Sequence, residues 1–241
     1  MELQFHRKEF EYEVRSQLKI FDRAITDVDA ASVTALDLSE FDFSIEDYET
    51  LCCFNNLNSL DINIGNTTSD FWSSFPKMRD LCVVCWEVLF DFESLKVMTD
   101  LESLTVSGGD ISDISYLNLD AIVDLQKLTY LELHEFGTVD LRPLKRMKQL
   151  RRLALRYSDK INNIDTLASM NFLEELELDG LYVESLDFLD ALPDTLNITM
   201  CGNHVSGGVD VGKWKRFAKR DICEISVGNQ QFKYIDLSAL D

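Results

Sequence analysis

Three histidines are the side chains of this sequence best suited to acid–base chemistry. They are His6, His134 and His204, and none stands in a recognisable order with the Ser or Cys and the Asp that nucleophilic catalysis requires. His134 follows Tyr130 and Glu132 at alternate positions, so it is the one candidate for general acid–base work. An enzyme of unknown type therefore stays an alternative, while the sequence favours a non-enzymatic protein.

Two short motifs carry ligand-binding spacing. The segment 207–213 reads G-x-x-x-x-G-K, which matches the start of a phosphate-binding loop, but Trp214 stands where a hydroxyl would hold magnesium. Cys82 and Cys85 have the spacing of zinc ligands, yet no second pair at that spacing completes a set of four. We therefore expect no metal and no cofactor.

These residues lie within a repeated phrase: an apolar residue, two variable ones, a second apolar residue, one variable, and a third apolar residue. The phrase predicts a short strand whose apolar side chains point inward and whose alternate side chains point outward. Apolar residues spaced by three in the following segments suit short 3₁₀ or α turns. The central leucines step by 24, 21, 23, 27, 22 and 23 positions: Leu36, Leu60, Leu81, Leu104, Leu131, Leu153 and Leu176. This period predicts an α/β leucine-rich repeat solenoid.

The repeats predict one continuous domain with a cap at each end. It divides into an N-terminal helical cap (1–32), about eight repeats (33–200) and a C-terminal cap (201–241). Solenoids need such caps because their terminal repeats would otherwise leave an apolar edge in water. The first cap carries an apolar stripe at helical spacing: Phe10, Val14, Leu18 and Phe21.

The pattern weakens toward the C-terminus. The segment 193–198 reads P-x-x-L-x-I and is taken as the eighth phrase, centred on Leu196. Residues 213–220 are predicted to form a short basic helix, and 222–227 one more strand.

The repeats resemble those of the bacterial leucine-rich repeat family, nearest the internalin-like type with about 22 residues per repeat. The segment 25–29 (I-T-D-V-D), followed by 33–38 (V-T-A-L-D-L), is similar to the junction between cap and first repeat in such proteins. The resemblance implies a curved solenoid with a parallel sheet on the concave face and helical or 3₁₀ returns on the convex face. It also implies that the concave face binds another protein.

One feature departs from that family. Its repeats usually carry Asn or Cys five residues after the central leucine, where the side chain bonds the backbone of the turn. Here those positions hold Phe41, Gly65, Trp86, Gly109, Phe136, Ser158, Leu181 and Cys201. The backbone groups of these turns are therefore expected to find other partners.

The outward positions of three neighbouring strands hold the densest group of residues suited to recognition. Tyr and Arg are enriched in binding hot spots, which favours a partner site here, whereas solvated ion pairs of little energy are the alternative. The predicted partner-binding residues are Tyr130, Glu132, His134, Arg152, Arg156, Glu175, Glu177 and Asp179.

The net charge of the chain limits the classes of partner that it can bind. The chain of 241 residues has 43 acidic and 23 basic side chains, a formal net charge of −20. This disfavours nucleic acid and anionic membranes, both of which attract basic proteins. A basic protein is the natural complement, and an immunity or inhibitor protein that neutralises one is an alternative role. Acidic charge also serves solubility, and the oligomeric state stays open.

The cysteines and the N-terminus bear on location. The six cysteines are expected to be reduced and buried, which fits the cytoplasm. The first residues lack the apolar run of a secretory signal, and no stretch approaches the length of a membrane span. A removed signal peptide would instead make the protein secreted or attached to the cell surface.

Overall fold

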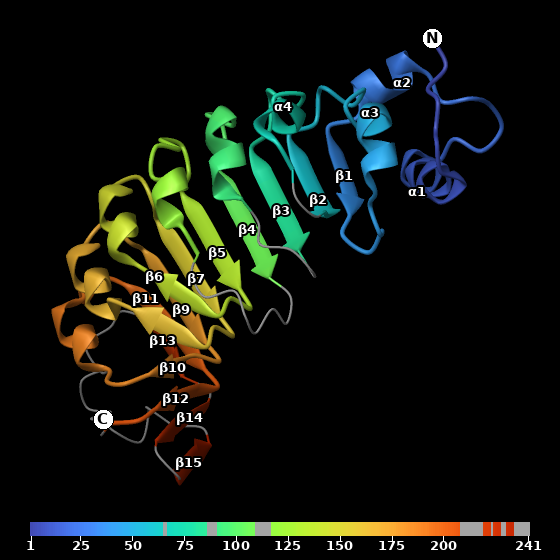
Figure 1. Cartoon of the computed structure of the whole chain (residues 1–241). Helices are drawn as coiled ribbons and strands as arrows, with labels where there is room; N and C mark the ends of the chain where they lie inside the picture. Colours follow the sequence, from blue (N-terminus) through green and yellow to red (C-terminus); the bar gives the residue numbers. More distant parts are fainter. Residues whose placement is uncertain are drawn as a thin grey trace. The chain divides into compact units, whose positions relative to one another are not determined.

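The computed structural model describes residues 1–64, 67–85, 91–108 and 117–207, and beyond them only the backbone of three strands. The chain divides into two compact units. Figure 1 labels its helices and strands. Unit 1 comprises Met1–Gly109 and Asp124–Leu128, and unit 2 comprises Asp110–Val123 and Thr129–Asp241. In the part that the structure describes, no helix is long and apolar enough to cross a membrane.

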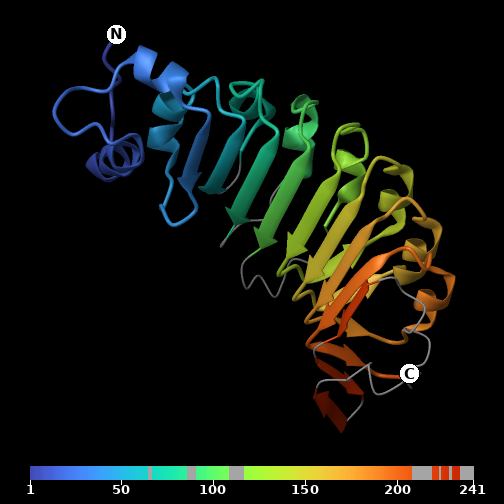
Figure 2. The same ribbon diagram turned by 180° about the vertical axis from the view of Figure 1, so that it is seen from behind.

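Four parallel strands form the sheet of unit 1, in the order of the chain (Figure 2). They are β1 (Ala35–Leu38), β2 (Ser59–Asn63), β3 (Asp80–Cys85) and β4 (Ser103–Gly108). The predicted central leucines lie side by side, because Leu36 pairs with Leu60, Leu60 with Leu81, and Leu81 with Leu104. All four are buried, so the repeated phrase places its apolar residues in the core as expected.

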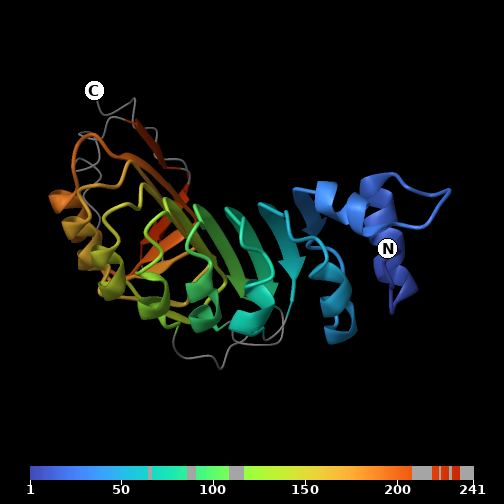
Figure 3. The same cartoon turned by 90° about the horizontal axis from the view of Figure 1, so that it is seen from above.

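Short helices return the chain behind this sheet (Figure 3). They are η1 (Ile45–Asp47), α3 (Tyr48–Leu51), α4 (Ser69–Trp72) and η2 (Phe92–Val97). The indole of Trp72 is buried among them, and its Nε1 donates to the hydroxyls of Thr67 and Ser94 at 2.7 and 3.1 Å. Pairing this N–H allows the large ring to be buried without the cost of an unsatisfied donor.

The N-terminal cap contains α1 (Lys8–Leu18) and α2 (Asp27–Ser32). Phe10 and Val14 are buried as predicted, but Phe21 is 65% exposed. The helix ends at Leu18 because Lys19 adopts a left-handed conformation (φ 58°), which turns Phe21 off the apolar stripe. The prediction was therefore wrong for Phe21.

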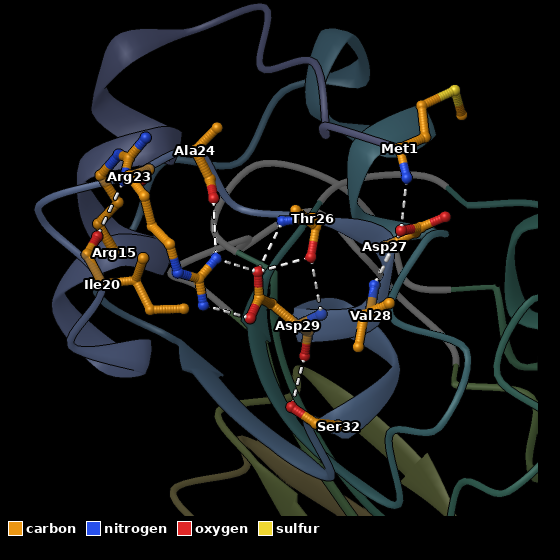
Figure 4. Close-up of polar contacts among 10 residues, drawn as sticks. All are labelled: Met1, Arg15, Ile20, Arg23, Ala24, Thr26, Asp27, Val28, Asp29 and Ser32. Atoms are coloured by element: carbon orange, nitrogen blue, oxygen red, sulfur yellow. Dashed lines mark hydrogen bonds and ion pairs between the residues drawn. The ribbon is translucent and has the colours of Figure 1, made fainter.

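A network of polar contacts holds the loop between α1 and α2 (Figure 4). The guanidinium of Arg15 donates to the carbonyls of Ile20 and Arg23 at 2.9 and 2.7 Å. Arg23 in turn makes two bonds to the carboxylate of Asp29, at 2.6 and 2.7 Å. Asp29 also forms a capping box with Thr26, so one carboxylate fixes both the loop and the start of α2.

Unit 2 contains five parallel strands in the order β5, β7, β9, β11, β13. Their bounds are β5 (Tyr130–His134), β7 (Arg152–Arg156), β9 (Glu175–Asp179), β11 (Asn197–Cys201) and β13 (Lys219–Ile222). Leu131, Leu153 and Leu176 align as predicted, but the residue that pairs with Leu176 is Ile198. The eighth phrase is thus centred on Ile198, two residues beyond the predicted Leu196.

This register restores one asparagine to the turn position. Asn203 stands five residues after Ile198 and is 1% exposed. Its Oδ1 accepts from the N–H of Leu181 at 3.0 Å, and its amide donates to the carbonyl of Leu178. The prediction of Cys201 at this position was wrong.

The other turn positions differ. Phe136 and Leu181 are buried apolar residues, and Ser158 is buried with a hydroxyl that has no hydrogen-bond partner. Phe41 is half-buried, while residues 65, 86 and 109 lie outside the described part. Apolar side chains therefore replace the asparagine at two of the three unit 2 turn positions that precede Asn203, and a buried serine replaces it at the third.

The returns of unit 2 include four 3₁₀ helices and two small outer sheets. The helices are η3 (Leu119–Ile122), η4 (Arg142–Arg146), η5 (Ile164–Ser169) and η6 (Asp187–Ala191). One outer sheet pairs β6 (Thr138–Asp140) with β8 (Lys160–Asn162). The other orders β10 (Tyr182–Val183), β12 (Asn203–Val205), β14 (Glu224–Val227) and β15 (Gln230–Lys233).

The C-terminal predictions need correction. Lys219 and Arg220 belong to strand β13 rather than to a basic helix, and residues 213–218 lie outside the described part. The predicted last strand also divides, because Ile222 ends β13 while residues 224–227 form β14 of the outer sheet. Two strands of different sheets thus stand where one strand was expected.

Candidate functional site

All eight predicted partner-binding residues lie on β5, β7 and β9, which are consecutive strands of the unit 2 sheet. The strands align three rows of outward residues. The rows are Tyr130–Arg152–Glu175, Glu132–Ala154–Glu177 and His134–Arg156–Asp179. Their side chains share one face because the leucines between them point into the core.

Arg156 is the centre of this surface. Its Nε lies 2.9 Å from Oε1 of Glu132, and its Nη1 lies 3.1 Å from Oδ2 of Asp179. Its Nη2 contacts Oε2 of Glu177. One guanidinium therefore joins carboxylates from both neighbouring strands. We call these four residues together with Tyr130 the Arg156 cluster.

The small size of Ala154 makes this arrangement possible. Ala154 stands between Glu132 and Glu177 in register, on the outward side, yet it is only 1% exposed. A methyl group leaves room for the longer neighbouring side chains to close over it, which brings the carboxylates within reach of Arg156. The sequence contained this signal, a single alanine among charged neighbours, but its consequence was not predicted.

Tyr130 extends the cluster toward Arg152. Its hydroxyl donates to Oε2 of Glu132, and Cζ of Arg152 lies 4.7 Å from the centre of its ring. Burial, followed by the bond to Glu132, raises the pKa of Tyr130, so the phenol stays protonated at neutral pH. Tyr130 thus serves as a donor and a cation-binding ring rather than as a base.

The cluster holds more negative than positive charge. Burial raises the pKa of Asp179, and this outweighs the attraction of Arg156. Burial opposes the charge of Arg156, but the surrounding carboxylates raise its pKa, so it remains a cation. Oδ1 of Asp179 is buried and has no hydrogen-bond partner. Three carboxylates facing one guanidinium leave the surface acidic and one acceptor unsatisfied.

Two of the predicted residues, His134 and Glu175, lie at the edge of this surface. The ring of His134 meets that of Tyr157 edge-on with centroids 5.2 Å apart, and its Nδ1 lies 3.8 Å from Oε2 of Glu135. Glu175 is exposed beside Arg152 in register. The histidine that was the candidate acid–base group is thus oriented by Tyr157 and Glu135.

Tyr157 is a surface residue that the sequence analysis missed. It is 58% exposed and has φ 51°, a left-handed conformation that is rare for residues other than glycine. Its ring covers Gly180, where an added Cβ would lie 2.4 Å from the ring. Aligning the repeats would have revealed it, because residues four after the central position share this conformation: Glu135, Tyr157, Gly180 and Gly202.

Metal and thiol chemistry find little support in the described residues. Within them, no three His, Cys, Asp or Glu side chains are grouped to hold a metal ion. Cys82 and Cys85 lie three apart on β3 and so face opposite sides, and burial raises the pKa of Cys85 to about 12. None of the five described cysteines forms a disulfide. Only Cys85 is buried, Cys53 is exposed and the other three are half-buried, so the prediction of buried thiols was wrong except at Cys85. Of the phosphate-loop motif, residues 208–213 lie outside the described part.

The fold can be compared with known proteins. An internalin (InlF) from Listeria monocytogenes superposes with a TM-score of 0.65 at 22% identity, covering 92% of this chain. Internalin C2 from the same organism gives 0.62 at 17% identity, again over 92% of this chain. The chain has the leucine-rich repeat fold. Searches against protein-family models and curated proteins give no match.

More distant leucine-rich repeat proteins share the fold. The plant peptide hormone receptor RGFR1, solved in complex with RGF2, matches with a TM-score of 0.54 at 16% identity over 84% of this chain. The complex of TLR13 with ssRNA13 gives 0.55 at 15% identity. The chain spans 64% of the InlF chain, 94% of the internalin C2 chain and 34% of each receptor.

Proposed function

We propose that this leucine-rich repeat protein is a non-enzymatic module that binds a protein partner through the outward face of β5, β7 and β9. The observation that carries the proposal is the Arg156 cluster, in which three carboxylates surround one guanidinium on a sheet face. Long side chains held in place by mutual contacts lose little entropy on binding. The face is therefore organised before the partner arrives.

The charge of this face favours a basic partner. Its eight residues include four carboxylates and two arginines, which leaves a net charge of −2. A lysine or arginine of the partner would reduce the repulsion among the carboxylates that face Arg156. Tyr130 and Tyr157 provide rings beside this charge, and tyrosines are enriched where binding energy is concentrated.

The related folds support protein binding only in general terms. RGFR1 is solved with RGF2, and TLR13 with an RNA, so the fold carries more than one ligand class. The net charge of −20 disfavours RNA for the present chain, because phosphate would be repelled. A basic protein, neutralised in the cytoplasm by this acidic one, is the more specific role that we propose.

Affinity capture with charge variants tests the proposal. We expect the immobilised chain to retain a partner from lysate of its source cells at low salt, and to lose it as salt rises. With the double variant Glu177→Gln/Asp179→Asn, the amount of the same partner that is retained should fall about tenfold or more, since two charge-assisted contacts are removed. The matched control Glu46→Gln/Glu49→Gln removes two exposed carboxylates of unit 1 and should recover it fully.

Two results would contradict the proposal. Equal recovery by the cluster variant, with its folding checked by circular dichroism, would place the binding site elsewhere. Recovery that does not change with salt would exclude charge complementarity as the mechanism.

A further inference from the structure

The outer strands of unit 2 are interrupted at one step. Thr138, Lys160, Tyr182, His204 and Ser226 follow one another at intervals of 22 residues. Three of the four neighbouring pairs are joined in parallel ladders, namely β6 with β8, β10 with β12, and β12 with β14. β8 and β10 belong to different sheets. A cleft of about 360 Å³ lies between them.

The interruption follows from the lengths of the repeats. In the repeats of β6 and β8, the residue with positive φ lies three positions before the outer-strand residue of the 22-residue series, as Tyr157 does before Lys160. In the repeats of β10 and β12, the residue with positive φ lies only two positions before the outer-strand residue, as Gly180 does before Tyr182. The extra residue sets β8 one position out of step with β10, so the ladder between them does not form.

The backbone of β8 exposes one pair of polar groups to this cleft. The N–H of Lys160 donates to the carbonyl of Gly137 at 2.8 Å, and the carbonyl of Asn162 accepts from Leu141 at 3.2 Å. Lys160 and Asn162 therefore direct their backbone groups toward β6. Ile161 lies between them, so its N–H and C=O point the opposite way, toward β10.

The backbone of β10, on the other wall, also directs one N–H and one C=O into the cleft. The N–H groups of His204 and Ser206 donate to the carbonyls of Leu181 and Val183 at 2.8 and 3.0 Å, so those residues face β12. The N–H and C=O of Tyr182 consequently point toward β8. Among the described hydrogen bonds, none engages the backbone of Ile161 or Tyr182.

The side chains around the cleft favour an uncharged polar ligand with apolar substituents. Lys160 and Asp165 stand on one wall and Glu184 on the other, so the cleft presents charges of both signs rather than a uniform complement to an anion or a cation. Val183 and Phe188 line the cleft as buried apolar residues. Tyr182 also lines it and is 61% exposed, which suits it to cover a bound chain.

We propose that this cleft binds an extended peptide segment of a partner protein through main-chain hydrogen bonds to Ile161 and Tyr182. A peptide backbone offers donors and acceptors at the spacing of a strand, and unpaired strand edges recognise it in this way. Mixed charge on the two walls fits a neutral main chain better than a phosphate or a metal ion. The site shares no residue with the Arg156 cluster, so this proposal can be tested independently of the proposed function.

Peptide selection followed by backbone methylation tests this site. A phage-displayed library of random peptides would be selected on the intact chain, and the enriched peptide would be synthesised with each amide N-methylated in turn. We expect at least one methylation to weaken binding about tenfold, since it removes a main-chain donor. Hydrogen exchange should show the amides of Ile161 and Tyr182 unprotected in the free chain and protected in the complex.

Variants locate the peptide. Glu184→Trp places a large ring on the wall of the cleft and should abolish binding, while the control Glu174→Trp, at an exposed residue of the same unit, should not. The sheet-face variant Glu177→Gln/Asp179→Asn should bind the peptide normally. The proposal is overturned if no enriched peptide is lost with Glu184→Trp, if methylation has no effect, or if only the sheet-face variant loses the peptide.

Discussion

The outward faces of the two units use the same strand geometry with opposite electrostatic results. In unit 1, Asp37 and Asp61 are direct neighbours on β1 and β2. Burial, and then the charges of Asp37 and Asp80, raise the pKa of Asp61. In unit 2, the corresponding face places Arg156 among three carboxylates from both adjacent strands. The aspartates of unit 1 repel one another, whereas in unit 2 Arg156 offsets part of the repulsion among the carboxylates.

Side-chain length explains the difference. Asp37 and Asp61 are too short to reach beyond their own row, and residues 24–76 contain no lysine or arginine. Arg156 reaches the diagonal positions Glu132 and Glu177 as well as Asp179 in its own row. Diagonal neighbours lie about 7–8 Å apart on a sheet, a distance that a long side chain spans. Repeats with equivalent cores can therefore carry different surface chemistry.

Removing Arg156 should cause the largest change. Arg156→Met keeps the apolar stem but leaves three carboxylates facing one another, so we expect a loss of about 2 kcal/mol in unfolding free energy at neutral pH. The carboxylates then bind protons more tightly in the folded chain than in the unfolded chain. The loss should shrink as pH falls and they become protonated, which urea unfolding over a pH series would measure.

The unit 1 residue Arg79 supplies the matched control. Its guanidinium lies 3.5 Å from Glu102, and both side chains are largely exposed. Arg79→Met should cost no more than about 0.5 kcal/mol and show little dependence on pH. Equal effects of the two substitutions would mean that the Arg156 cluster is no more than a set of surface ion pairs.

Replacing Gly180 should have an effect of similar size, through the backbone that supports Tyr157. Gly180 and Gly202 both have positive φ, 62° and 65°, but only at Gly180 would a Cβ meet the ring of Tyr157. Gly202→Ala should cost about 1 kcal/mol from the left-handed backbone alone. Gly180→Ala should cost about 1 kcal/mol more, measured by the same urea unfolding.

A double-mutant cycle isolates the contact. In a Tyr157→Ala background the ring is absent, so Gly180→Ala should cost no more than Gly202→Ala. A full extra cost that persists without the ring would assign it to the backbone rather than to Tyr157.

The sequence predicted the inner strands well because their signal is simple. Seven central leucines recur at intervals of 21 to 27 residues, and their side chains are buried in the core. The eighth phrase was misplaced because Leu196, Ile198 and Met200 are all apolar at alternate positions, so two registers fit equally. Only the pairing of Ile198 with Leu176, and the bonds of Asn203, distinguish them.

The surface was predicted in part. Repeat alignment gave the rows of outward residues, so the eight candidate positions lie together on three strands as expected. It could not give the direction that Arg156 takes, which depends on the space above Ala154. It also could not give the cleft beside Tyr182, which arises from a one-residue difference between repeats.

Replacing Asp61 in unit 1 should have the smallest effect on the free energy of unfolding, and it tests the other half of the comparison. Because the pKa of Asp61 is higher in the folded chain than in the unfolded chain, its ionisation opposes folding at neutral pH. Asp61→Asn should therefore stabilise the chain at neutral pH, by less than about 1 kcal/mol because the group is partly exposed. The gain should disappear below the pKa of an unfolded aspartate, where both states are protonated. Glu40→Gln, at a nearby exposed carboxylate, controls for net charge, and an equal gain there would show that crowding among Asp37, Asp61 and Asp80 is not the cause.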